Sequence, residues 1–311
     1  MASEGKPSSL AALRAWLRLV RIEHAVLSAF GVLVSMLIAS RIPRAVLDEV
    51  ILTQPLPAPP IVMAALLVPI LINIGAFALN DYWDIEADRL NKRKERPLVS
   101  GALHPRVALA TAILGLALGA LAGFFINFEA GIIALLFSIL SIAYDLRLKD
   151  WPLAGNLFVA FSMAIAFLFG FVAAGTDIMH IGMAVWVLCA GAASAGFGRE
   201  LVKTVQDMKG DREARGSKSL PHVIGARNSM LLAALSFALY CAAIPVIFLS
   251  SSFLSWNIVS SGLLALSFVA FAFMSCQLAH SGSGPDTLER VRKASLYALA
   301  SAMLALLLAA I

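Results

Sequence analysis

The sequence PPIVMAALLVPILINIGAFA, residues 59–78, has no charged side chain and leads directly into LNDYWDIEAD, residues 79–88. Twenty apolar residues in a helix cover about 30 Å, the thickness of the hydrocarbon core of a membrane. The second stretch places four acids between Asp81 and Asp88, and a largely basic segment, residues 92–96, comes next. This arrangement predicts a membrane-spanning helix that ends in a charged site.

The composition indicates an integral membrane protein. Of the 311 residues, 60% are hydrophobic and 14% are charged, and the mean hydropathy is +0.87. Soluble proteins carry about 25% charged residues. The net charge of +5 does not indicate a nucleic-acid partner, since no soluble basic domain is present to bind one. Three cysteines stand alone in apolar segments and share no metal-ligand spacing with the five histidines, so we expect them to be packing residues.

Nine apolar runs are long enough to cross a membrane as helices. They do not alternate between polar and apolar residues, which excludes a β-barrel. The first run follows three arginines and can be read as a signal peptide, but the eight further runs favour a retained helix. We therefore expect an all-α polytopic membrane protein, a single domain over residues 1–311, with spans near 23–40, 61–83, 106–126, 129–146, 152–174, 180–203, 228–249, 254–279 and 291–311.

The positive charges divide between the two sides of the membrane unequally. With the N-terminus on one side, that side receives all of the 24 Lys and Arg residues except Arg41 and Arg44. By the positive-inside rule the basic side is cytoplasmic. We therefore expect a protein of the cell membrane with a cytoplasmic N-terminal segment, 1–22. Two cytoplasmic loops, 84–105 and 204–227, carry the acidic motifs and place the active site toward the cytoplasm.

The first acidic motif has helical spacing. Asn80, Asp84 and Asp88 are four residues apart, and Asp81 lies three residues before Asp84. If the second span continues as a helix beyond its apolar part, these side chains share one face. Their like charges repel, more strongly at the low dielectric of a membrane cleft than in water. A hard divalent cation between them removes that cost.

A second acidic motif ends the sixth span, in GRELVKTVQDMKGD, residues 198–211. Asp207 and Asp211 are four residues apart, and Arg199 and Lys203 continue the same spacing toward the membrane. Two acidic helix ends with basic neighbours suggest a cavity that binds Mg²⁺ with a diphosphate, because Mg²⁺ prefers a few carboxylates plus phosphate oxygens. The alternative is a pair of solvated loops that anchor to lipid headgroups.

The two motifs resemble those of the UbiA superfamily of intramembrane prenyltransferases. NDYWDIEAD fits the pattern NDxxDxxxD, and DMKGD fits the pattern DxxxD. AYDLRLKDWPLAGN, residues 143–156, resembles a third family motif through Tyr144, Lys149 and Asn156, although Asp145 stands where many relatives have Ser. The resemblance implies a bundle of nine helices around a central cavity, where an allylic isoprenyl diphosphate meets Mg²⁺.

The resemblance also implies roles for individual residues. Four aspartates of the two motifs would hold the metal: Asp84, Asp88, Asp207 and Asp211. Asn80 and Asp81, at the start of the first motif, would support them directly or through water. The diphosphate would be bound by Arg93, Lys149 and Lys203. Tyr144 would face the prenyl carbocation. Four phenylalanines are either tunnel residues or plain packing residues: Phe124, Phe125, Phe158 and Phe161.

The acceptor is the least constrained substrate. GRELVKTVQDMKGD followed by GSKSLP is similar to the archaeal digeranylgeranylglyceryl phosphate synthase type of the family, which implies geranylgeranylglyceryl phosphate as the acceptor and ether-lipid synthesis as the role. Arg21, Arg199 and Glu200 are the candidates for binding it. An aromatic acceptor, 4-hydroxybenzoate or a naphthoate, remains the alternative. A membrane transporter is the alternative of another class, although the acids gather at one end and the middle of the spans lacks charge.

Overall fold

A computed structural model describes residues 9–46, 50–53, 55–90, 92–177, 182–215, 219–281 and 284–311. Over these residues nine helices are long and apolar enough to cross a membrane. Each helix overlaps one of the nine predicted spans, although α8 and α9 extend well into the predicted loop between them, so the all-α multi-pass prediction is confirmed. The helices are α2 Ile22–Arg41, α3 Pro59–Trp83, α5 Pro105–Ile126, α6 Phe128–Leu146, α7 Ala154–Ala173, α8 Met183–Arg215, α9 Leu220–Ser250, α10 Ile258–Ser281 and α11 Pro285–Ala310.

Local sequence signals explain where several helices begin. α3, α5 and α11 each start at a proline, whose missing N–H and fixed φ suit the first helical turn. The Asn127 side chain caps α6 by accepting a hydrogen bond from the Ala130 N–H at 2.7 Å. The same side chain donates to the Val172 carbonyl at 2.9 Å, which ties the start of α6 to the end of α7.

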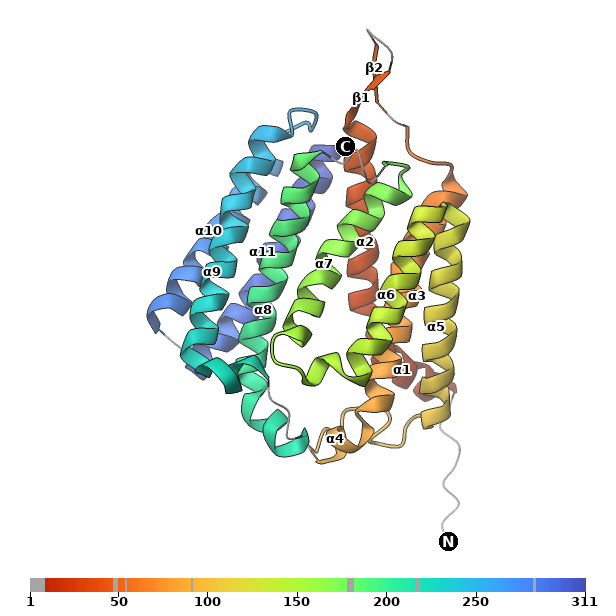
Figure 1. The fold of residues 1–311 in the computed structure, drawn as a ribbon, viewed down its shortest axis with the longest axis vertical. Helices are drawn as coiled ribbons and strands as arrows, with labels where there is room; N and C mark the ends of the chain where they lie inside the picture. The colour runs from red at the N-terminus through yellow and green to blue at the C-terminus, as the bar shows by residue number, and fades with distance from the viewer. Residues whose placement is uncertain are drawn as a thin grey trace.

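The membrane-spanning helices form a ring in which each helix packs against the next, and α2 lies between the two ends of this series (Figure 1). α3 packs against α2 and α5, and the chain then continues around through α6, α7, α8, α9, α10 and α11. α2 contacts both α7 and α11, and α8 contacts α11 as well. These contacts close the ring around the interior that the helices share, as the resemblance implied.

α3 and α5 approach each other unusually closely because glycines face each other. A Cβ atom added to Gly115 of α5 would lie 2.7 Å from the Gly75 backbone nitrogen, and one added to Gly75 of α3 would lie 2.7 Å from the Leu116 nitrogen. Small residues allow such backbone contact between membrane helices. α3 therefore packs closely against α5 along the half of the helix that leads to the first acidic motif.

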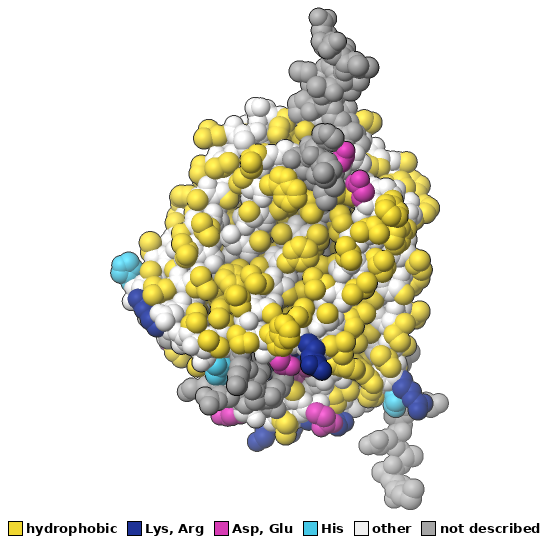
Figure 2. Space-filling view, viewed as in Figure 1, with side chains coloured by type: hydrophobic (Ala, Val, Ile, Leu, Met, Phe, Trp, Pro, Cys, Tyr) yellow, Lys and Arg dark blue, Asp and Glu magenta, His cyan; other side chains and the backbone are white. Residues whose placement is uncertain are grey.

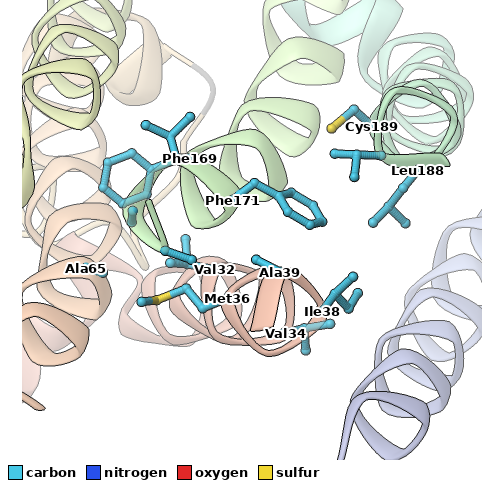
Figure 3. Packing of buried hydrophobic residues seen from close by; sticks show 14 of the residues in the cluster. Val32, Val34, Met36, Ile38, Ala39, Ala65, Phe169, Phe171, Leu188 and Cys189 are labelled. Carbon is cyan, nitrogen blue, oxygen red and sulfur yellow. The ribbon is translucent and has the colours of Figure 1, made fainter. Parts of the chain in front are cut away.

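Apolar packing fills the bundle and also covers its outside. In the interior, Phe169 and Phe171 of α7 lie against Val32 and Met36 of α2, with Leu188 of α8 close by (Figure 3). On the outside, hydrophobic side chains cover the flank, and most of the charged side chains visible on this face gather at the lower end (Figure 2). An apolar flank between polar ends is expected of a surface in contact with lipid.

Five short elements lie in segments that were predicted to be loops. A short amphipathic helix, α1 Ser9–Val20, precedes the first span, and the Trp16 indole N–H donates to Thr111 Oγ1 on α5 at 3.2 Å. A two-stranded antiparallel hairpin, β1 Pro43–Val46 and β2 Val50–Thr53, follows α2. The segment 84–105 contains the helix α4 Ile85–Leu90, and Leu148–Asp150 forms the 3₁₀ turn η1.

The predicted loop 204–227 is mostly helical. α8 continues to Arg215, and α9 already begins at Leu220. Residues of strong helix propensity, such as Lys, Gln, Met, Glu and Arg, make up most of the α8 extension. The loss of apolar character at Lys203 therefore ends the membrane span without ending the helix, and this is why the prediction placed the boundary too early.

Candidate active site

A cavity of about 560 Å³ lies inside the ring. Most transmembrane helices contribute to its wall, which is apolar over most of its length and includes Val68, Ile72 and Phe169. The charged side chains of the wall and Asn80 gather at one end, where the first acidic motif and the polar part of α8 lie. They are Arg21, Asn80, Asp145, Arg199, Glu200, Lys203 and Arg292. The cavity thus offers an apolar chamber with a charged end.

The first acidic motif keeps its helical spacing past the end of α3. The Asp84 N–H donates to the Asn80 carbonyl at 2.9 Å, and the Asp88 N–H donates to the Asp84 carbonyl at 2.8 Å. Asp81, Asp84 and Asp88 are all buried, with 3%, 8% and 2% of their surfaces exposed. The prediction of one shared face is confirmed, and its carboxylates are taken out of water.

Asp81 is held by two arginines from different segments. Arg21 Nη2 lies 2.9 Å and Arg96 Nη1 lies 2.6 Å from Asp81 Oδ1. The Arg21 backbone is left-handed, with φ 45°, and its guanidinium lies 4.6 Å from the ring centre of Phe77. Burial lowers the pKa of Arg21, repulsion from Arg96 lowers it further, and Asp81 opposes both. Arginine still keeps its charge at neutral pH.

The other acids of the site are paired as well. Lys149 Nζ lies 2.6 Å from Asp84 Oδ1 and 3.7 Å from Asp145 Oδ1. The Asn80 amide donates to Asp145 Oδ1 at 2.8 Å. Asp88 lies 3.4 Å from Arg93 Nη1 and 3.7 Å from Arg96 Nε. We call Asp81, Asp84, Asp88 and Asp145 the acidic cluster; its charge is balanced by four cations, Arg21, Arg93, Arg96 and Lys149.

The acidic cluster has the donor chemistry of a Mg²⁺ site. Its ligands are hard oxygens, and the Lys149 ammonium between Asp84 and Asp145 shows that these carboxylates hold a cation. Asp81 Oδ2 is buried without a hydrogen-bond partner. Within the described part of the chain, no three His, Cys, Asp or Glu side chains surround a common point. A metal ion here would therefore complete its shell with water and substrate oxygens, as Mg²⁺ prefers.

The second acidic motif lies at the same end of the bundle as the first. α4 contacts α8, and both α4 and the C-terminal part of α8 lie at the lower end in Figure 1. Asp207 is partly buried on α8. The backbone of Asp211 belongs to α8, but its side chain lies outside the described residues. Asn156 of α7 donates to Thr204 Oγ1 at 2.8 Å and joins the third motif to this helix.

A second group of charged residues lines the cavity from α8 and α11. We call Arg199, Lys203 and Arg292 the basic cluster. Lys203 Nζ lies 3.4 Å from Glu200 Oε1, the carboxylate that shares this wall. Arg292 and Arg199 are close enough to repel each other electrostatically. His24 of α2 is close enough to Arg199 and Lys203 for their positive charges to act on its imidazole ring. Of the predicted acceptor residues, Arg199 and Glu200 therefore lie together, whereas Arg21 pairs with Asp81 of the acidic cluster.

One aromatic wall faces the cavity beside the acidic cluster. The rings of Tyr144 and Phe158 stack at 4.4 Å between centroids, and Phe137 stacks on Phe158 at 5.7 Å. All three line the cavity. The other proposed tunnel residues do not line it: Phe124 and Phe125 are on α5 with exposed rings, and Phe161 is 44% exposed on α7. Their helical spacing reflects the lipid-facing side of each helix.

Comparison with known proteins identifies the family. The model of the UbiA prenyltransferase family matches residues 28–295. The chain belongs to the UbiA prenyltransferase family. The family prediction is confirmed, and with it the assignment to the prenyltransferases.

Named relatives within the UbiA family are similar over much of the chain. The digeranylgeranylglyceryl phosphate synthase of Methanothrix thermoacetophila is 39% identical over 184 residues, which are 59% of this chain and 65% of that protein. A solved structure of a digeranylgeranylglyceryl phosphate synthase has a TM-score of 0.72 at 26% identity, over 96% of this chain and 99% of that one. A UbiA homologue from Archaeoglobus fulgidus, bound to GPP and Mg²⁺, has a TM-score of 0.65 at 20% identity, over 93% and 99%.

Three charged residues at the candidate site were given no role by the prediction. Arg96 was read as part of the basic segment 92–96 and not as the partner of Asp81 and Asp88. Asp145 was noted only as a departure from the family pattern, yet it joins the acidic cluster through Asn80 and Lys149. Arg292 was not considered at all. The available signal was its position within the predicted span 291–311, because a charged residue inside a span is functional by default.

Proposed function

We propose that this UbiA-family protein transfers an isoprenyl group from an allylic isoprenyl diphosphate to the hydroxyl group of a glycerol phosphate-type lipid, in ether-lipid synthesis. The observation that carries the proposal is the charge-balanced acidic cluster at the polar end of an apolar cavity. An isoprenyl chain suits the apolar chamber, and a diphosphate suits the charged end. The names of the relatives support the acceptor.

The charge balance of the acidic cluster gives a reason for the metal requirement. Its four carboxylates are already matched by four cations, so a diphosphate would bring in unbalanced negative charge. Mg²⁺ bound with the diphosphate would balance it and stabilise the leaving group. Asp84 and Asp88 would hold metal from α3 and α4, Asp207 and Asp211 from α8, and Asn80 and Asp81 would support them. The UbiA homologue bound to GPP and Mg²⁺ supports the presence of the metal with the diphosphate.

The reaction exchanges one carbon–oxygen bond for another. The allylic C–O bond breaks and its electron pair leaves with the diphosphate, where Arg93 and Lys149 take up charge. Lys203, the third residue predicted for this role, lies in the basic cluster beside Glu200 on the cavity wall instead. The allylic cation faces the Tyr144 ring, which stabilises it and keeps water away. The acceptor hydroxyl then forms an ether bond with the cation carbon and loses its proton. Glu200, on the cavity wall, is the candidate to receive that proton.

The site assignment also implies a direction. With the polar end of the cavity at the cytoplasmic face of the cell membrane, the soluble head of the diphosphate would enter from the cytoplasm and the prenyl tail from the lipid. The excess of Lys and Arg at this end supports that orientation. Labelling single introduced cysteines with a membrane-impermeant reagent, one in α4 and one in the hairpin, would test it. Protection of the α4 position in intact cells is the expected result.

The decisive experiment measures pyrophosphate release and product formation with a panel of acceptors. Purified protein with geranylgeranyl diphosphate and Mg²⁺ should turn over with geranylgeranylglyceryl phosphate and stop when EDTA is added. Turnover with 4-hydroxybenzoate or a naphthoate in its place would support the aromatic alternative. Solute flux in liposomes without any transfer would support a transporter and contradict the proposal.

A further inference from the structure

The basic cluster differs from every cation at the acidic cluster, because in the described part of the chain no carboxylate forms a salt bridge with either of its guanidinium groups. Arg199 and Arg292 line the cavity from two helices, α8 and α11. Across the described residues, neither guanidinium has a hydrogen bond or an ion pair, and Arg199 Nε is buried without any partner. A buried donor without an acceptor is costly, and native proteins rarely keep one without a reason. A ligand that supplies the acceptor would remove that cost.

The acids near the basic cluster do not cancel its charge. On α11, Glu289 is bound by Lys293, whose Nζ lies 2.6 Å from Glu289 Oε1. On α8, Glu200 is the one carboxylate of this wall among the described residues, and it faces Lys203 at 3.4 Å. Three cations and one carboxylate leave two surplus positive charges beside the cavity. The acidic cluster, in contrast, is balanced.

We infer that Arg199, Arg292 and Lys203 form an anion site for the phosphomonoester of the acceptor, separate from the acidic cluster that receives the diphosphate. The inference rests on the proposed function. A phosphomonoester carries a charge of about −1.5 to −2 at pH 7, which matches the surplus of the basic cluster. A benzoate carries one negative charge and an uncharged alcohol none, so either would leave the guanidinium groups under-compensated.

The geometry of the two arginines suits phosphate in a further respect. Guanidinium groups present planar pairs of donors that match two oxygens of one phosphate. Arg199 and Arg292 come from different helices that contact each other, so one phosphate between them would hold α8 and α11 together. The site therefore binds the acceptor head and positions its hydroxyl toward the centre of the cavity. It makes Arg292 a residue that determines which acceptor is used.

The test compares a phosphorylated acceptor with its dephosphorylated alcohol, using full-length protein in neutral detergent with geranylgeranyl diphosphate and Mg²⁺. Arg292→Gln should raise the KM for geranylgeranylglyceryl phosphate by about 10- to 100-fold, the usual range for a lost charge-assisted hydrogen bond. The KM for geranylgeranyl diphosphate and the rate with the alcohol should stay at the wild-type values. Arg292→Lys should recover part of the loss, since it keeps the charge but not the paired donors.

Lys293→Gln is the matched control, because Lys293 is the next residue, carries the same charge and does not line the cavity. It should leave both KM values unchanged. Arg199→Gln is the second variant, with an acceptor KM effect at least as large as that of Arg292→Gln. Unfolding temperatures of all four variants should show that they are folded under the assay conditions.

Three results would overturn the inference while leaving the proposed function intact. One is a wild-type acceptor KM in Arg292→Gln and Arg199→Gln. Another is an equal rise in the KM of both substrates, which would mean one shared anion site. The third is an effect seen only in vesicles that contain anionic phospholipid, which would assign the arginines to bulk lipid headgroups. Failure of the wild-type protein to use the phosphorylated acceptor would end the inference and the proposed function together.

Discussion

The acidic cluster and the basic cluster lie at the same end of one cavity, but their charges are arranged in opposite ways. Every carboxylate of the acidic cluster has a cationic nitrogen within 3.7 Å. In the described part of the chain, the guanidinium groups of Arg199 and Arg292 have no such partner. A balanced cluster is stable by itself and admits an anion only together with a cation. An unbalanced cluster is prepared for an anion alone.

The difference teaches how one cavity can tell two phosphate-bearing lipids apart. Both substrates would place an apolar tail in the chamber, so the tails alone provide little discrimination. The diphosphate would go to the side that needs Mg²⁺, and the phosphomonoester to the side that does not. The side of the cavity that each head group occupies is then a consequence of electrostatics. Substitutions on each side can test this difference.

The largest effect is expected from Asp84→Asn, which removes a proposed metal ligand and the closest partner of Lys149. Turnover at saturating substrate should fall roughly 10²- to 10³-fold, the size of effect seen when one group that stabilises transition-state charge is lost. Glu86→Gln is the control, because Glu86 lies in the same short helix with its side chain 80% exposed. Equal turnover of the two variants would contradict the role of the acidic cluster.

Asp81→Asn should break the balance of the acidic cluster from within. It leaves Arg21 and Arg96 without their shared carboxylate, whose side chain is only 2% exposed. The free energy of unfolding should fall by about 3 kcal/mol, because removing one partner leaves uncompensated charge behind. Chemical or thermal unfolding in detergent measures this change. Arg21→Gln should cost less, since Arg96 remains bound to Asp81, and a larger loss in Arg21→Gln would refute the explanation.

Gly115→Ala should displace the acidic cluster by moving α3, and it should leave the basic cluster on α8 and α11 in place. The new Cβ would lie 2.7 Å from the Gly75 nitrogen and 2.7 Å from the Leu71 carbonyl, so α3 and α5 must separate. The expected loss of stability is about 1–3 kcal/mol. The KM for the diphosphate should rise above its wild-type value by a larger factor than the KM for the acceptor. Gly262→Ala on α10 meets no atom within 4 Å and should be neutral or slightly stabilising. Similar behaviour of both variants would count against the close contact.

The smallest effect concerns the aromatic wall. Tyr144→Leu should lower kcat about tenfold, because the loss of a ring facing the allylic cation removes about 1–2 kcal/mol. Tyr144→Phe keeps the stack on Phe158 and should retain most of the activity. Tyr297→Leu, on α11 with 78% of its surface exposed, is the control for a tyrosine outside the cavity. A pronounced defect in Tyr144→Phe would assign the role to the hydroxyl group instead.

The sequence predicts well what depends on neighbours along the chain. The nine spans follow from unbroken apolar runs, and the shared face of Asn80, Asp84 and Asp88 follows from four-residue spacing. The extension of α8 was missed because polarity marks the edge of the membrane and not the end of a helix. The hairpin after α2 was missed because its strands are too short to show alternation.

Pairings between distant segments were not accessible to the same reasoning. Arg21 meets Asp81 across 60 positions, and Asn80 meets Asp145 across 65. Nothing in the local spacing of either residue names its partner. Arg292 comes to the cavity wall only because α11 packs against α8 and α2. The charges of a membrane site can be read from the sequence, whereas their neutralisation requires the fold.

The left-handed residue at the junction of α1 and α2 has a consequence for how this family member can be altered. Arg21 is simultaneously the hinge between the two helices and a partner of Asp81, while α1 is fastened to α5 through Trp16 and Thr111. One residue inserted at the start of α2 would rotate that hinge by about 100° about the helix axis. The guanidinium would then miss its carboxylate although every side chain had been retained. The rotational setting of α2 relative to α1 is thus as necessary to the site as the arginine itself.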